Sequence, residues 1–172
     1  MELKEAIQDR RSIRRFGKKE VPREFIIELI ELGHMAPSAG NLQARDFVVV
    51  EDQDTRRKLG RAALDQDFIA EAPVAVVVCA NFERIAHYGV RGVTLYCLQD
   101  AAAAIQNMLL AIHDKGLGCV WVGAFDEEEV SRILNLPNFI RPVAILPIGE
   151  PLSQPEARKR IPVEELIHYE KW

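Results

Sequence analysis

The sequence of 172 residues has few cysteines and few aromatic residues. Its cysteines are odd in number and form no CxxC pair, at positions Cys79, Cys97 and Cys119. This pattern excludes a disulfide framework and favours buried, reduced thiols. The four histidines lie far apart without an HExxH pair, so their spacing predicts no metal site. Gly116 and Gly118 follow a helical pattern and precede a strand, which is the reverse of the order that a dinucleotide-binding fold needs.

An excess of positive charge and long apolar runs are also missing. The chain has 22 Lys and Arg against 26 Asp and Glu, a formal charge of −4, which argues against a general surface for nucleic acid or anionic membrane. The first residues are charged, unlike a leader or anchor, and the apolar run 101–112 is too short to span a bilayer. We therefore expect a cytoplasmic protein that binds neither nucleic acid nor membrane.

The composition predicts one globular domain over residues 1–172. Hydrophobic residues make up 48% and charged residues 28% of the chain, as in ordinary folded proteins. A single core is normal up to roughly 250 residues. Periodicity predicts helices at 3–8, 22–36, 54–72, 98–115 and 126–136, and strands at 46–51, 72–80, 119–125 and 141–151. This order indicates an α+β fold with a mixed central sheet flanked by helices.

The helix at 98–115 is apolar over most of its circumference, and Gly116 suits its C-terminal cap. It therefore needs burial nearly all round. The alanines at 101–104 would let another helix approach closely, and a chain of this size has few elements of its own to surround the helix. We expect a homodimer in which a second copy covers it. The alternative is a central helix wrapped within one chain.

Two basic clusters stand out near the two ends of the chain. They are Arg10, Arg11, Arg14 and Arg15, and Arg158, Lys159 and Arg160. Each cluster alone also fits a solvated turn. In a chain of net negative charge, any basic site must be local to these clusters, and the sequence raises the question of which anion they hold.

Six segments in collinear order resemble the FMN-dependent nitroreductase family. They cover nearly the whole chain and read "RRSIRRF" at 10–16, "APSAGNLQ" at 36–43, "DAAAAIQNMLLAIHDKGLG" at 100–118, "CVWVGAFDEEEV" at 119–130, "RPVAILPIGEP" at 141–151 and "RKRIPVEELIHYEKW" at 158–172. The resemblance implies an interlocked α+β homodimer that binds one FMN in each of two sites at the subunit interface.

The resemblance also assigns the basic clusters to the FMN phosphate. Arg10 and Ser12 would contact the phosphate, with Arg158 and Arg160 completing the cradle and Arg11 as a further candidate. The chemistry agrees, because guanidinium groups bind phosphate in a bidentate way and a serine hydroxyl adds a neutral donor.

The ring of the flavin would lie against three other residues, by the same resemblance. Arg14 would stand beside the pyrimidine edge, where a fixed cation favours the reduced flavin and raises its potential. The backbone N–H groups of Gly123 and Ala124 would face flavin N5 and O4, since small residues let the backbone approach a planar ring.

The loop after the second predicted helix would come from the partner subunit. Pro37, Ser38 and Asn41, with Gln43, would touch the flavin ring and the ribityl chain. Taken alone, this run is also a good loop that needs no ligand.

The activity that the resemblance implies is a ping-pong oxidoreduction. NADH or NADPH would pass hydride to flavin N5, and a small-molecule acceptor such as a nitroaromatic or a quinone would then take the same place. No side-chain acid or base is required, so no catalytic residue is named. The alternatives are a flavoenzyme specialised for one metabolite, a non-catalytic FMN-binding or regulatory module and, from the basic clusters alone, a nucleic-acid-binding protein. Residues 80–92 match no family segment and leave the substrate pocket undefined.

Overall fold

An antiparallel sheet forms the centre of the fold in the computed structural model, which describes residues 1–172. Its four strands lie in the order β1-β2-β4-β3. The strands are β1 (Arg45–Val50), β2 (Val74–Asn81), β3 (Gly118–Cys119) and β4 (Ile140–Gly149). All three strand pairs are antiparallel, and the parallel component that the sequence predicted is limited to one isolated bridge between Ser12 and Cys119.

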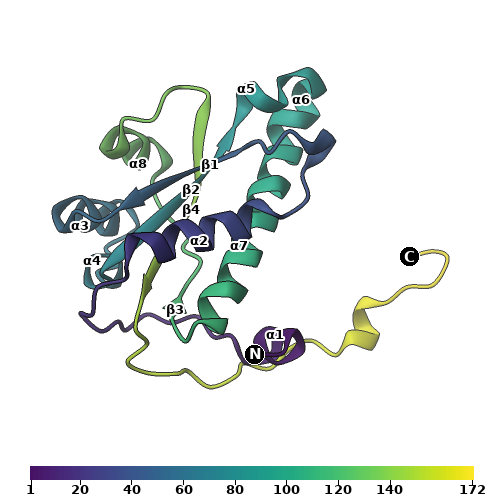
Figure 1. The fold of residues 1–172 in the computed structure, drawn as a ribbon. Helices are drawn as coiled ribbons and strands as arrows, with labels where there is room; N and C mark the ends of the chain where they lie inside the picture. The colour runs from purple at the N-terminus through teal and green to yellow at the C-terminus, as the bar shows by residue number, and fades with distance from the viewer.

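Helices cover both faces of this sheet (Figure 1). The α-helices are α1 (Leu3–Asp9), α2 (Arg23–His34), α3 (Gln53–Ala62), α4 (Phe68–Glu71), α5 (Phe82–Ile85), α6 (Gly89–Arg91), α7 (Cys97–Asp114) and α8 (Glu127–Leu134). Single turns lie at η1 (Ala39–Asn41), η2 (Ala86–Tyr88) and η4 (Val163–Leu166), and η3 (Gly92–Tyr96) is π-helical. The α+β architecture predicted from the sequence is confirmed.

The alternation of side chains along β2 divides the core into two layers. Val76 and Val78 pack with α2 and α7 on one face, whereas Ala75 and Val77 pack with α3, α4 and α8 on the other. Successive side chains of a strand point to opposite faces, so a strand that is buried along its whole length needs helices on both sides. This arrangement holds α7 across the sheet from end to end.

Two predicted elements differ from the structure. The helix expected at 54–72 is broken into α3 and α4, because the chain reverses at Leu64 and Asp65 with left-handed backbone angles (φ 60° and 57°). This reversal lets the backbone of Gln66 pack against Gly60. The strand expected at 119–125 is limited to β3 and an isolated bridge at Val122, because the chain turns away from β4 to begin α8.

One face of α7 is open in the single chain, so the helix is not wrapped within one copy, and its cover by a second copy stays a prediction. Its fully buried residues include Ala101, Ala104 and Ile105. The opposite stripe is partly or fully exposed and consists of Gln99, Ala102, Ala103, Gln106, Asn107 and Leu110. The continuous helical run 82–114 reaches the length and apolarity of a membrane span, but its longest part, α7, packs one face on the sheet as a core helix does.

The last residues of the chain leave the body of the molecule (Figure 1). Residues 152–172 are exposed throughout, and the apolar residues Leu166, Ile161 and Trp172 among them are 61, 62 and 101% exposed. An extended segment that displays this much apolar surface gains stability by lying against another surface.

Candidate functional site

The two basic clusters meet in one cavity of about 620 Å³. Its lining comes from the end of α1, the segment after it, and the segment that follows β4. The lining residues are Ile7, Gln8, Arg10, Arg11, Ser12, Arg14, Pro155, Glu156, Ala157, Arg158 and Arg160. We call this cavity the arginine cradle. The sequence predicted six residues of these two regions to contact the FMN phosphate or the pyrimidine edge of the flavin, and all six line this one cavity. They are Arg10, Arg11, Ser12, Arg14, Arg158 and Arg160. Almost 150 positions separate the two clusters in the sequence.

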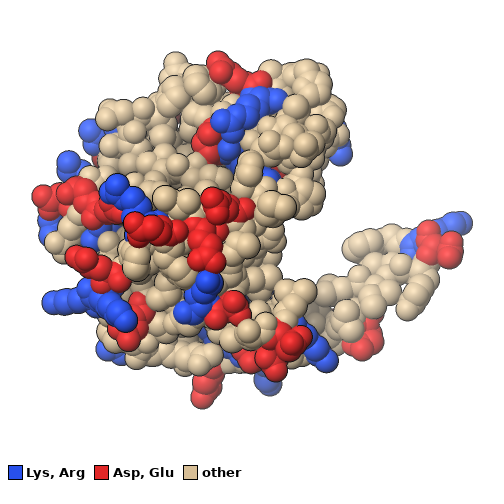
Figure 2. Space-filling view, in the orientation of Figure 1, with Lys and Arg blue, Asp and Glu red and all other residues tan.

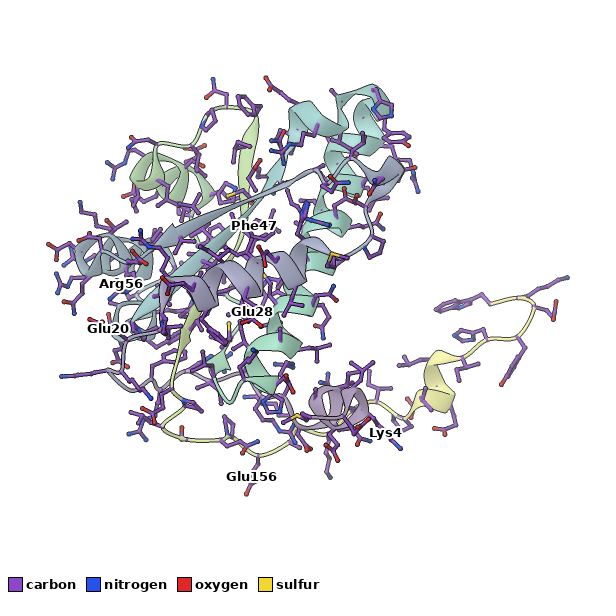
Figure 3. The ribbon with its side chains drawn as sticks, in the orientation of Figure 1. Lys4, Glu20, Glu28, Phe47, Arg56 and Glu156 are labelled. Carbon is purple, nitrogen blue, oxygen red and sulfur yellow. The ribbon has the colours of Figure 1, made fainter.

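The arginine cradle carries an uncompensated positive charge. Five arginines and one carboxylate line it, a balance of +4 (5 − 1). The carboxylate is Glu156, on the segment that leads toward α1 (Figure 3). None of the five guanidinium groups takes part in an ion pair of the chain. On the face that Figure 2 shows, basic and acidic side chains are interspersed, so the excess of positive charge in the cradle is a local feature.

Ile13, in the segment between α1 and α2, holds this segment against β3 by its buried side chain and by its backbone. Its backbone N–H donates to the carbonyl of Cys119 at 3.0 Å, beside the bridge between Ser12 and Cys119. A Cβ at Gly118 would lie 2.8 Å from the Ile13 side chain, so only glycine fits there. Because side chains alternate along an extended segment, burying Ile13 turns Ser12 and Arg14 to the opposite side.

Two further contacts place the ends of the arginine cradle. The side-chain amide of Gln154 donates to the carbonyl of Asp9 at 3.4 Å, which ties the segment after β4 to the end of α1. Arg11 donates to the carbonyl of Gln8 at 2.6 Å, so this guanidinium is partly engaged, whereas Arg10 has no side-chain hydrogen bond. Arg14 lies 6.0 Å from the centre of the Phe68 ring.

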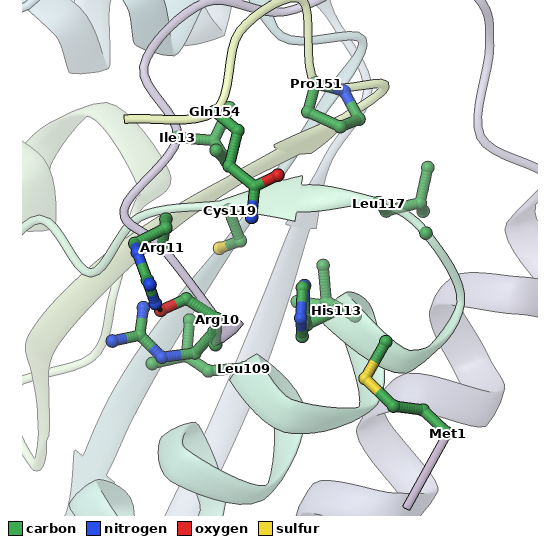
Figure 4. Close-up of a pocket in the computed structure, with 12 residues that line it drawn as sticks. Met1, Arg10, Arg11, Ile13, Leu109, His113, Leu117, Cys119, Pro151 and Gln154 are labelled. Atoms are coloured by element: carbon green, nitrogen blue, oxygen red, sulfur yellow. Dashed lines mark hydrogen bonds between the residues drawn. The ribbon is translucent and has the colours of Figure 1, made fainter. Parts of the chain in front are cut away.

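A smaller cavity of about 230 Å³ adjoins the arginine cradle and shares Arg10 and Arg11 with it (Figure 4). His113, near the end of α7, lines this cavity, and its Nε2 atom is buried without a hydrogen-bond partner. Cys119 lies at the same place, and burial raises the pKa of its thiol. A thiol with a raised pKa is a poor nucleophile, so this cavity offers no activated cysteine.

The loop at 37–43 lies far from the arginine cradle of the same chain. Asp100, which contacts this loop, and His113, beside the cradle, are thirteen positions apart on α7, and at 1.5 Å per residue they are separated by about 20 Å. One chain therefore does not bring Pro37, Ser38, Asn41 and Gln43 to its own cradle. Their predicted approach to the flavin requires a second copy.

The loop itself has an unusual backbone. Gly40, Asn41 and Gln43 have left-handed φ values of 57°, 55° and 47°, a conformation that costs energy for a residue such as glutamine. The hydroxyl oxygen of Ser38 accepts from the Gln43 N–H at 3.0 Å, and the Gln43 amide donates to the Asn41 side chain at 2.7 Å. Asn41 and Pro37 are exposed on the outer side of the loop.

Gly123 and Ala124 form an exposed turn outside the lining of the arginine cradle. The turn is held by a hydrogen bond from the Gln66 side chain to the Ala124 carbonyl at 3.3 Å, and from the Asp126 N–H to the Ala62 carbonyl at 2.8 Å. It follows the segment that pairs with Ser12.

Sequence reasoning missed two kinds of residue. The first is the rest of the cradle wall, including Glu156, which no motif marks. The second is a pair of buried charges behind the 37–43 loop, Asp100 and Arg45. Asp100 carries a signal in the sequence, because it is a lone carboxylate at the start of an alanine-rich, apolar helix.

Comparison with known proteins places this geometry in a family. The family model described as "Nitroreductase family" matches residues 7–67 and 61–150. An NADH dehydrogenase of Thermus thermophilus is 33% identical, over 97% of this chain and 95% of that protein. The chain belongs to the nitroreductase family. It is therefore an oxidoreductase with a nitroreductase fold.

Two further relatives extend this comparison. The FMN reductase (NAD(P)H) of Bacillus subtilis is 29% identical, over 99% of this chain and 74% of that protein. The solved structure of the NADPH:FMN oxidoreductase from Vibrio harveyi complexed with NAD⁺ matches with a TM-score of 0.92 at 28% identity, covering 99% of this chain and 77% of that one. The family resemblance inferred from six sequence segments is thus confirmed over nearly the whole chain.

Proposed function

We propose that the chain binds FMN with its phosphate in the arginine cradle and acts as an NAD(P)H-dependent flavin oxidoreductase. The observation that carries this proposal is the convergence of five arginines without ion-pair partners around one cavity. Such a set of groups fits a phosphate, because guanidinium forks form charge-assisted hydrogen bonds with two oxygens at once. Arg10, Arg158 and Arg160 would hold the phosphate with the hydroxyl of Ser12, and Arg11 would add charge.

The flavin ring would extend from the cradle along the segment that pairs with Cys119. Arg14 lies two residues beyond Ser12, on the same side of this extended segment, and so would stand beside the ring. Gly123 and Ala124 would present backbone N–H groups to its far edge, where their small side chains allow a close approach.

A second copy of the chain would complete the site. The exposed stripe of α7 includes Ala102 and Ala103, and small residues permit close packing of a second α7. If the two helices lie antiparallel about a twofold axis, the end of one meets the start of the other. The 37–43 loop of the second copy then reaches the cradle of the first, and the exposed apolar tail at 152–172 gains a surface to cover.

The chain contributes binding, orientation and charge to the reaction. When bound, FMN would supply the hydride chemistry between NADH or NADPH and an organic acceptor such as a nitroaromatic or quinone, in ping-pong order. The Arg14 guanidinium is a fixed positive charge that would lie near the ring and stabilise the negative charge of the reduced flavin. No acidic or basic side chain has to move a proton for hydride transfer. We place this activity in the cytoplasm.

Two relatives support this assignment by their names, which are FMN reductase (NAD(P)H) and NADPH:FMN oxidoreductase. The test is the absorbance spectrum of the purified protein before and after anaerobic addition of NADH or NADPH. We expect a bound-flavin spectrum that bleaches on addition and returns with an acceptor. Protein that carries no flavin and binds no added FMN would refute the proposal. Flavin that stays oxidised would instead indicate a specialised flavoenzyme or a non-catalytic FMN-binding module.

A further inference from the structure

Two charged side chains are buried behind the 37–43 loop and belong to neither the arginine cradle nor the exposed turn. Asp100, on α7, is 4% exposed, and Arg45, at the start of β1, is 2% exposed. Buried charges are costly unless they are hydrogen-bonded. Both of these side chains direct their hydrogen bonds almost entirely to the backbone of one short segment.

Asp100 binds the two ends of that segment. Its carboxylate accepts from the Ala39 N–H at 2.9 Å and from the Ala44 N–H at 3.3 Å. One carboxylate therefore fixes the backbone on both sides of the left-handed residues Gly40, Asn41 and Gln43.

Arg45 binds the carbonyl groups on the other side of the loop. Its guanidinium donates to the carbonyls of His34 at 2.8 Å, Ala36 at 2.7 Å and Pro37 at 3.3 Å. It also donates to the backbone carbonyl of Asp100 at 2.9 Å. The positive charge thus lies at the C-terminal end of α2, where the helix dipole favours a cation.

Together the two side chains stabilise a loop conformation that the residues of the loop alone would not favour. Three left-handed residues within four positions, one of them glutamine, cost conformational energy that surrounding contacts must offset. The contacts within the loop are short-range, such as Ser38 to Gln43. Asp100 ties it by side-chain hydrogen bonds from α7, and Arg45 does so from β1. Arg84, on α5, adds one bond to the Gln43 carbonyl at 3.1 Å.

We propose that Asp100 and Arg45 are positioning residues that hold residues 36–44 in the conformation that binds the flavin ring of the neighbouring copy. This inference rests on the proposed function. Neither residue would touch the flavin. Asparagine cannot replace Asp100, because its amide has one acceptor and one donor group, whereas two N–H donors converge on the carboxylate. Lysine cannot replace the fork of Arg45, because its single ammonium group lacks the planar array of donors.

The experiment compares Asp100→Asn and Arg45→Lys with the full-length wild-type chain in two measurements. The first is amide hydrogen exchange of residues 36–44 without flavin. The second is the affinity for FMN and for riboflavin, which lacks the phosphate, by flavin fluorescence. Glu28→Gln is the matched control, because this carboxylate lies on α2, pairs with Lys115 and is far more exposed.

We expect exchange at Ala39 or Ala44 to become at least about tenfold faster in Asp100→Asn, since a hydrogen bond to a charged group is lost. FMN and riboflavin should both bind more weakly, and by the same factor, because the loop would contact the ring and not the phosphate. Glu28→Gln should change neither measurement. Arg45→Lys should act in the same direction, and it replaces Asp100→Asn as the deciding variant if the latter does not fold.

Unchanged exchange, or a loss of FMN affinity with riboflavin affinity intact, would overturn the inference. Failure of both variants to fold would also overturn it, because the two residues would then serve stability alone. If the wild-type chain binds neither flavin while exchange in the variants is faster, the proposed function fails and the flavin-positioning role fails with it. The stabilisation of the loop by Asp100 and Arg45 would then remain as a separate result.

Discussion

Replacing Arg160 with alanine tests the arginine cradle most cleanly. The Arg160 side chain lines the cavity and is exposed, and it makes no hydrogen bond or ion pair within the chain. Its removal therefore leaves no buried group without a partner, and the fold should keep its stability. The expected effect is confined to the phosphate of bound FMN.

The magnitude follows from the contact that is lost. A hydrogen bond to a charged group contributes about 1.5–3 kcal/mol, and the exposure of Arg160 places it at the low end because water screens the charge. We expect FMN affinity to fall about tenfold, since about 1.4 kcal/mol corresponds to a factor of ten. Riboflavin affinity should stay unchanged, because riboflavin carries no phosphate.

The assay is a titration of flavin fluorescence at two salt concentrations. Added salt should weaken FMN binding to the wild type more than to Arg160→Ala, since one phosphate contact has been removed and ions screen exposed charges beyond about 10 Å at 0.1 M. Lys159→Ala is the matched control, because Lys159 is the neighbouring cation and lies outside the cavity lining. Equal affinities for FMN in all three proteins, or equal losses for FMN and riboflavin, would refute the assignment of this cavity to the phosphate.

Three further predictions concern the packing around the site. Gly118→Ala should lower the free energy of unfolding by about 1–3 kcal/mol and weaken FMN binding, because the new Cβ would lie 2.8 Å from the Ile13 side chain. An unchanged free energy of unfolding, measured by urea denaturation, would contradict this prediction. Ala103→Glu should yield monomers in size-exclusion chromatography and lose flavin, and a flavin-loaded dimer would count against the α7 interface. Burial raises the pKa of Cys79 from 9.0 to about 12, so the unfolded chain loses this proton first. The free energy of unfolding should then fall by about 1.4 kcal/mol per pH unit from Cys79 alone between those two values, and urea titrations of Cys79→Ala should give a slope that is smaller by this amount.

The α+β class and most elements of the fold followed from periodicity, but local turns did not. The strand β2 is buried on both faces, and its run of β-branched residues indicates this directly. The break between α3 and α4 was missed, because tertiary packing at Gly60 and Gln66 overrides a helical pattern that continues through Leu64. The open face of α7 could not be assigned either, since an apolar helix does not show in its sequence which side meets a second chain.

The candidate site was foreseen where it depends on residue type and missed where it depends on burial. The two basic clusters are visible in the sequence because each holds several arginines within a few positions. The structure brings Arg10, Ser12 and Arg160 from these regions to one cavity. The role of each toward FMN stays a prediction. Asp100 and Arg45 were missed, because their hydrogen bonds go to backbone atoms, and no sequence motif records backbone partners.

The central claim, that one flavin site is built from two chains, is tested most directly by complementation between variants. One chain carries Arg10→Ala with Arg160→Ala in the cradle, and the other carries Ser38→Ala with Asn41→Ala in the loop. Each homodimer should retain little FMN, whereas mixed dimers contain one site with both parts intact. Random pairing at equal amounts should restore FMN binding to about a quarter of all sites. No recovery on mixing, or full FMN binding by the loop variant alone, would contradict the claim.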